Sequence, residues 1–143
     1  MDFCIINTLK NVFSDLKTVV VIGCSSNPYR TSFHIAQYIQ EAGLTMVPVN
    51  PNEDEVLGEV CYDTIFDLPE SVHVDVIDIF RNKRYTEKMV REIVEWSESS
   101  GQKPVIWTQL DVSTQAAKQL AEENGFDYVE NRCLMVEHRK TGA

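Results

Sequence analysis

A loop of small and hydroxylated residues, from Gly23 to Ser32, has the composition of a phosphate-binding loop. It follows an apolar β-branched run and precedes a helical pattern, and backbone N–H groups and the helix dipole can hold an anion at such a junction. Hydroxyls such as that of Ser25 can donate to phosphate oxygens, and Arg30 can neutralise their charge. The alternative is a plain turn in which Thr31 or Ser32 caps the helix. The place of the loop in the chain favours phosphate binding.

A second candidate for anion binding is the most basic stretch of the chain, where Arg81, Lys83 and Arg84 fall within four residues. Cations at the start of a helix oppose the helix dipole, so a bound anion would relieve that penalty. The alternative is a solvated helix start. Phe80, just before these cations, serves either the core or a stacking surface.

Polar and special residues follow three other apolar runs. Asn50 can hydrogen-bond a ligand, and Pro51 is either a turn former or a rigid apolar wall for an adenine. Gln109 either binds a polar ligand tail or caps the next helix. Asn131 and Cys133 follow the last run, and Cys133 is either a buried structural cysteine or a neighbour of a ligand thiol.

The elements that must position these residues alternate along the chain. Runs that are apolar on both faces predict strands buried between helix layers. They lie near residues 18–22, 44–49, 72–80, 104–107 and 126–129. Helical periodicity covers residues 33–42, 86–96 and 113–124, with Ser113 as a candidate N-cap. The alternation predicts an α/β fold: a Rossmann-like, doubly wound sheet of about five parallel strands with helices on both faces.

The remaining segments carry weaker signals. We expect one domain over residues 1–143, beginning with an amphipathic helix over residues 1–14. Residues 51–69 lack periodicity and are expected to hold a turn near 52–54 and a brief helix near 65–68. The closing residues Glu137, His138 and Arg139 are either a functional pair or, as is more usual, part of a hydrogen-bonded tail.

In such a sheet, ligands bind outside the carboxyl ends of the strands, where the strand order reverses. All the candidate loops follow predicted strands and therefore meet at that edge. A dinucleotide cofactor is disfavoured, because only the first glycine of G-x-G-x-x-G is present and Asn50 stands where a ribose-binding carboxylate is usual. No nucleophile–base–orienter set is visible. The scattered cysteines and histidines show no metal-ligand spacing, so no metal site is predicted.

Composition limits the partners. Thirteen Lys and Arg against 22 Asp and Glu give a formal net charge of −9, which argues against nucleic acid or an anionic membrane as a partner. No apolar run approaches the ~18 residues of a spanning helix. The sequence also lacks the pattern of a secretory signal, so a reducing, cytoplasmic setting is expected. A local basic loop remains compatible with one small polyphosphate.

Six short motifs occur in an order that resembles the stand-alone CoA-binding domain proteins. The chain is also similar to the CoA-binding domain of the succinyl-CoA synthetase alpha subunit, over about residues 14–139. The motifs are residues 21–28 (VIGCSSNP), 47–51 (VPVNP), 57–62 (LGEVCY), 78–81 (DIFR), 107–110 (WTQL) and 131–138 (NRCLMVEH).

The resemblance implies a Rossmann-like sheet that binds CoA, with the pyrophosphate on the loop of residues 23–32. Asn50 and Pro51 would border the adenosine, and Gln109, Asn131 and Cys133 would lie toward the thiol. The first loop is longer than in the synthetase, and 143 residues leave no room for its phosphohistidine domain, so ligase activity is not implied. The expected binding residues are Gly23, Cys24, Ser25, Ser26, Asn27, Arg30, Thr31, Ser32, Asn50, Pro51, Phe80, Arg81, Gln109, Asn131 and Cys133.

The favoured function is binding of coenzyme A or an acyl-CoA without catalytic machinery of its own. The alternative is an enzyme, either a nicotinamide oxidoreductase or a CoA-transfer or ligase component that needs a separate partner chain. A signalling receiver domain ranks last, because no acidic cluster follows the first predicted strand. A homodimer and a separate partner subunit both stay open. A mixed disulfide between Cys133 and CoA is a further hypothesis, which requires an accessible thiolate.

Overall fold

The computed structural model describes residues 3–141, and side chains from residue 9 onward. Five parallel strands form its central sheet in the order β2-β1-β5-β6-β7. They are β1 (Thr18–Ile22), β2 (Thr45–Val49), β5 (Val76–Ile79), β6 (Val105–Thr108) and β7 (Tyr128–Val129). The strand order reverses between β1 and β5, and this reversal is the switch point at which doubly wound sheets bind ligands. The predicted Rossmann-like α/β fold is confirmed.

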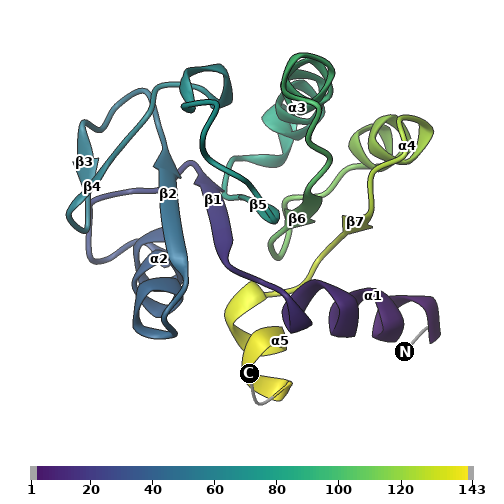
Figure 1. Cartoon of the computed structure of the whole chain (residues 1–143), viewed down its shortest axis with the longest axis horizontal. Helices are drawn as coiled ribbons and strands as arrows, with labels where there is room; N and C mark the ends of the chain where they lie inside the picture. Colours follow the sequence, from purple (N-terminus) through teal and green to yellow (C-terminus); the bar gives the residue numbers. More distant parts are fainter. Residues whose placement is uncertain (1–2, 142–143) are drawn as a thin grey trace.

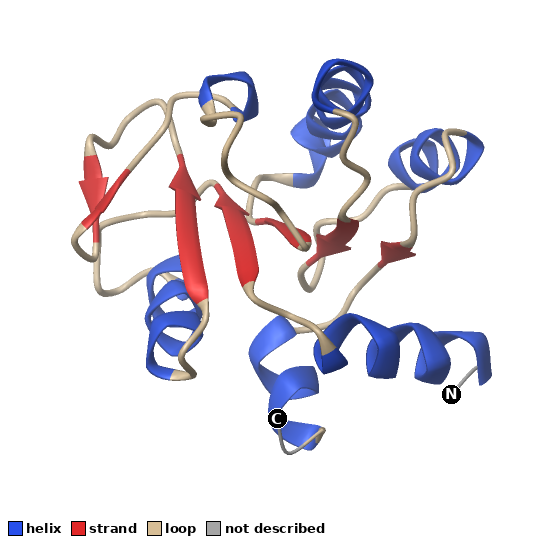
Figure 2. Ribbon diagram, viewed as in Figure 1, coloured by secondary structure: helices blue, strands red, loops and turns tan. Residues whose placement is uncertain are grey.

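Helices cover both faces of the sheet (Figures 1 and 2). One face carries α1 (Phe3–Ser14), α2 (Thr31–Glu41) and α5 (Leu134–Lys140). The other carries the short 3-10 helix η1 (Ile65–Asp67), α3 (Thr86–Ser100) and α4 (Gln115–Glu123), and a second 3-10 helix, η2 (Lys83–Tyr85), precedes α3. Residues 1–2 of the helix expected at the start, and residues 142–143 of the expected domain, lie outside the described residues.

Side chains alternate between the two faces of the sheet along each strand, so the hydrophobic core forms two clusters, one on each face. In β1, Val19 and Val21 pack toward α1, α2 and α5, whereas Val20 and Ile22 pack toward α3 and α4. Both sets are buried, which is why the strand reads as a continuous apolar run. The same alternation places Asp78, which is paired in register with Val21, on the α2 side of the sheet.

Three predicted boundaries were wrong. β5 begins at Val76 and not at residue 72, because the Gln102 side chain bonds the Val74 N–H and the Val72 carbonyl in place of a neighbouring strand. β7 has only two residues. The N-cap of α4 is Thr114, whose hydroxyl accepts from the N–H of Ala117 at 3.1 Å. Ser113 instead bonds side chains near β7.

The segment over residues 51–69 holds more structure than expected. The brief helix is present as η1, but a hairpin of β3 (Glu55–Val56) and β4 (Glu59–Val60) was missed. Its two turn residues, Leu57 and Gly58, both have positive φ, as type I′ turns require. The hairpin lies beside β2 (Figure 1).

The expected hydrogen-bonded tail after residue 133 forms a helix. Helix α5 buries Leu134, Glu137 and His138. His138 makes a 2.7 Å hydrogen bond through Nδ1 with the Tyr38 hydroxyl, and the Phe13 ring packs edge-on against it. These tertiary contacts hold a helix of seven residues that would be marginal alone. Within residues 3–141, no helix combines the length and apolarity needed to cross a membrane.

Candidate functional site

Gly23 joins the loop after β1 to the loop after β5. Its N–H donates to the Val49 carbonyl at 2.7 Å, and its φ of 83° is readily available only to glycine. A side chain at this position would run into the Phe80 carbonyl oxygen. The two loops at the switch point therefore touch backbone to backbone through this glycine.

Several N–H groups of the predicted phosphate loop are already hydrogen-bonded to side chains of the protein. The N–H of Ser25 donates to the Ser32 hydroxyl and that of Asn27 to the Ser25 hydroxyl, each at 3.0 Å. The N–H of Ser26 donates to the Glu53 carboxylate. The N–H groups of Thr31 and Ser32, which open α2 and have no intrahelical acceptor, are available to a ligand.

The alternative role of this loop, in which Thr31 or Ser32 caps helix α2, was wrong about the capping residue. Arg30 occupies the N-cap position of α2, and neither Thr31 nor Ser32 does so. No side chain caps this end of the helix in the described structure. The exposed Arg30 side chain and the uncapped N–H groups border one hollow, which is lined by Gly23, Ser25, Tyr29, Arg30, Thr31, Ser32 and Phe80.

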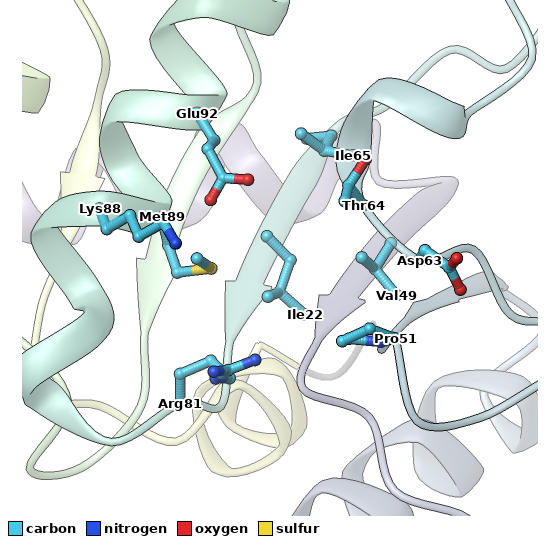
Figure 3. A pocket seen from close by; sticks show the side chains of 10 residues that line it. All are labelled: Ile22, Val49, Pro51, Asp63, Thr64, Ile65, Arg81, Lys88, Met89 and Glu92. Carbon is cyan, nitrogen blue, oxygen red and sulfur yellow. The ribbon is translucent and has the colours of Figure 1, made fainter.

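A second cavity lies on the other face of the sheet, between the ends of β1 and β2 and helix α3 (Figure 3). Ile22 and Arg81 line it, whereas their sequence neighbours Gly23 and Phe80 line the first hollow. The two spaces thus lie on either side of the switch point. The lining residues are Ile22, Val49, Pro51, Asp63, Thr64, Ile65, Arg81, Lys88, Met89 and Glu92.

A third hollow follows β7 at the same sheet edge. It contains Asn131 and Cys133 of the predicted site, and it also has two exposed apolar residues, Leu110 and Val136. Arg132 and Glu137 form an ion pair of 3.4 Å at this hollow. The three hollows together follow the carboxyl ends of the strands.

Three predicted binding residues brace the loops that surround these hollows. Asn50 donates to the Cys24 carbonyl and accepts from the N–H of Asn52, each at 3.0 Å. The side-chain Oδ1 of Asn131 accepts from the N–H of Asp111 at 3.0 Å. Gln109 is buried and donates to Asp78. Their hydrogen bonds tie neighbouring loops together.

Asp78 is a fully buried carboxyl group at the switch point. Its Oδ2 accepts from the Gln109 side-chain amide at 2.8 Å, while its Oδ1 has no hydrogen-bond partner. Burial raises the pKa of Asp78 well above its usual range, and the bond from Gln109 opposes this effect. In the sequence, Asp78 stands out only as part of a motif. Its burial becomes visible only when the pairing of β5 with β1 and β6 is known.

The cavity residues that sequence reasoning missed lie mainly on α3. Lys88, Met89 and Glu92 face the cavity, and Asp63 and Thr64 line it from the segment before η1. Lys88 and Glu92 are four residues apart and so share one helix face. That spacing was the available signal, but it is equally typical of a solvent-exposed helix.

The cysteines differ in their expected reactivity. Burial, followed by the nearby Cys61, raises the pKa of the Cys24 thiol to about 12, and burial raises that of Cys61 to about 11. Cys133 is half-buried and lines a hollow. Since the thiolate is the nucleophile, iodoacetamide at pH 8 should alkylate Cys133 at least tenfold faster than Cys24 or Cys61. Peptide mapping by mass spectrometry measures this, and equal rates at the three sites would contradict the assigned burial.

Comparison with known proteins agrees with this arrangement. The chain is 28% identical over 133 residues to uncharacterized protein YneT of Bacillus subtilis, covering 93% of each chain. A solved structure, a hypothetical protein from Pyrococcus horikoshii, superposes with a TM-score of 0.85 at 30% identity and covers 96% of this chain and 92% of that one. Over 65 residues the chain is 35% identical to the ADP-forming acetate–CoA ligase II of Archaeoglobus fulgidus, which is 44% of this chain and 10% of the ligase.

The family model described as "CoA binding domain" matches residues 17–139. The match includes every strand of the central sheet and all three hollows at its carboxyl edge. Because this match covers most of the chain, the chain belongs to the CoA binding domain family.

Proposed function

We propose that the protein binds coenzyme A or an acyl-CoA across the carboxyl edge of its sheet. The observation that carries this proposal is the row of three hollows at that edge, in a chain of the CoA binding domain family. CoA has an adenine, phosphate groups and a long thiol-bearing arm, and each hollow has the chemistry for one of these parts.

The hollow at the start of α2 suits the pyrophosphate. The N–H groups of Thr31 and Ser32 and the positive end of the helix dipole favour an anion there. Arg30 is exposed beside them and adds a charge. The Glu53 carboxylate on the N–H of Ser26 disfavours a phosphate at that point of the loop. We therefore assign the phosphate to residues 30–32 rather than to the whole predicted loop.

The cavity beside α3 suits the adenosine. Its walls are apolar at Val49, Pro51 and Met89, which fits the faces of a base. Arg81 reaches the same cavity from the loop after β5 and supplies a cation for the ribose phosphate (Figure 3). Its guanidinium also stacks on Tyr85 at 4.9 Å, which limits its movement.

The hollow after β7 suits the end of the pantetheine arm. Cys133 and Asn131 lie there, and exposed Leu110 and Val136 offer an apolar surface for an acyl group. The Gln109 side-chain amide is held by Asp78, so its proposed role is to shape the path of the arm.

Titration calorimetry with CoA tests this proposal. We expect Arg30→Ala and Arg81→Ala each to weaken CoA binding about tenfold, because each removes a charge-assisted contact to a phosphate. Lys10→Ala, which removes an exposed cation on α1, is the control and should leave the affinity unchanged. Absence of CoA binding at millimolar concentration, with binding of NAD instead, would overturn the proposal.

Protection of Cys133 tests the direction of the ligand. Desulfo-CoA, which has no thiol of its own, is expected to slow alkylation of Cys133. Adenosine 3′,5′-bisphosphate, which lacks the pantetheine arm, is the control ligand and is expected to leave the rate unchanged. Equal protection by both ligands would place the arm elsewhere.

A further inference from the structure

Glu92 presents an unpartnered carboxylate oxygen to the cavity beside α3. Its side chain points from the helix into the cavity (Figure 3), and its Oε2 is shielded from solvent without a hydrogen-bond partner in the described structure. An acceptor that is buried and unsatisfied is costly, and such groups in native proteins call for an explanation. A ligand that donates a hydrogen bond at this point would supply one.

Neighbouring cations do not satisfy this oxygen. Lys88 and Arg81 line the same cavity, but within residues 9–141 no ion pair joins either of them to Glu92. Burial raises the pKa of Glu92, and the positive charge of Lys88 opposes this. The carboxylate thus shares the cavity with two cations, and its buried Oε2 still has no hydrogen-bond partner in the described structure.

The surroundings narrow the chemistry of the missing donor. The apolar side chains of Pro51, Val49, Ile22 and Met89 fit a flat ring better than a charged ammonium group. In CoA, the group that joins a flat ring to an N–H donor is the exocyclic amino group of adenine. Hypoxanthine, by contrast, has a carbonyl oxygen at that place, which would face the carboxylate as acceptor against acceptor.

We propose that Glu92 is a specificity residue that accepts a hydrogen bond from the adenine amino group and so selects adenine over hypoxanthine. This inference rests on the proposed binding of CoA. A site built around a ligand N–H rejects the analogue that lacks it, because the buried acceptor is then left unpaired.

The test compares CoA with its analogue that has hypoxanthine in place of adenine, by titration calorimetry. Wild-type protein is expected to bind CoA about 10–100-fold more tightly than the analogue, the effect of one hydrogen bond to a charged group. Glu92→Gln keeps the shape of the side chain, and its amide can either accept from adenine or donate to hypoxanthine. We expect the preference to fall to within about threefold in this variant.

Glu95→Gln is the matched control, because Glu95 lies on the exposed face of the same helix. It should keep the wild-type preference. Equal binding of CoA and the analogue by wild-type protein, or an unchanged preference in Glu92→Gln, would overturn the role of Glu92 while leaving CoA binding intact. Failure of CoA itself to bind would refute the proposed function, and the role of Glu92 with it.

Discussion

Replacing Gly23 with alanine is expected to lower the free energy of unfolding by about 2–5 kcal/mol. Two effects add at this residue. A side chain at a φ of 83° costs roughly 1–2 kcal/mol, and forcing a methyl group into occupied space costs roughly 1–3 kcal/mol more. The obstacle is the Phe80 carbonyl, a backbone group that cannot rotate away. The added methyl group therefore has to separate the loops after β1 and β5.

Gly43→Ala separates these two effects. Gly43 has a nearly identical φ of 85°, but no atom lies within 4 Å of the place that its Cβ would take. Its replacement should therefore cost only the roughly 1–2 kcal/mol of the backbone conformation. Urea unfolding of both variants measures the difference. Equal losses would show that the contact between the two loops has no energetic weight.

Gly23→Ala should also weaken ligand binding, whereas Gly43→Ala should not. The hollow that we assign to the pyrophosphate lies between residues 23–32 and Phe80. Separating the loops moves Arg30 and the start of α2 away from the loop that carries Arg81. Binding measured below the unfolding transition distinguishes this effect from loss of folded protein.

The central sheet was predictable because burial on both faces makes a strand visible without any knowledge of its partners. β1 and β6 are apolar along their lengths and were placed within a residue. The loops that follow them were then assigned to the binding edge by topology alone. The hairpin after β2 was not predictable in this way, because it depends on Leu57 adopting a positive φ that leucine rarely takes.

The loops that carry the predicted site residues meet at one edge of the sheet, and their role in binding stays a prediction. Arg30, Arg81 and Cys133 line hollows, as their loops indicated. Asn50 and Gln109, which are predicted to contact a ligand, also make internal bonds to Cys24 and Asp78. These bonding partners are distant in the sequence, so no local spacing of residues predicts the bonds.

The helix residues of the site were hidden for a different reason. Glu92 and Lys88 belong to a polar helix face that resembles any solvated face in the sequence. Only the position of α3 over the ends of β1 and β2 turns that face toward a cavity. A pattern of residue types predicts which side chains share one face of a helix. Only the fold determines whether that face contacts solvent or lines a cavity.

Asp78→Asn is expected to change how stability depends on pH. The folded-state pKa of Asp78 lies well above 3.8 because its carboxyl group is buried. Well below pH 3.8 the group is protonated in both folded and unfolded chains. As the pH rises from 4 through the folded-state pKa, the unfolded chain gains a solvated carboxylate that the folded chain cannot match. The wild-type protein therefore loses stability over this range, and a neutral asparagine removes that loss.

Between pH 3 and pH 7 the variant should gain stability relative to wild type, by roughly 1.4 kcal/mol for each pH unit that separates the unfolded-state and folded-state pKa values of Asp78. Urea unfolding at the two pH values measures the gain, and Asp127→Asn, at an exposed carboxylate, should show none. A constant difference between the variant and wild type would mean that Asp78 is ionised with a donor on Oδ1. The expected gain would instead show that the fold keeps a neutral carboxyl group at the switch point. The Gln109 amide donates to that carboxyl group and is held in place by it. The same carboxyl group would then lower the stability of the protein at neutral pH.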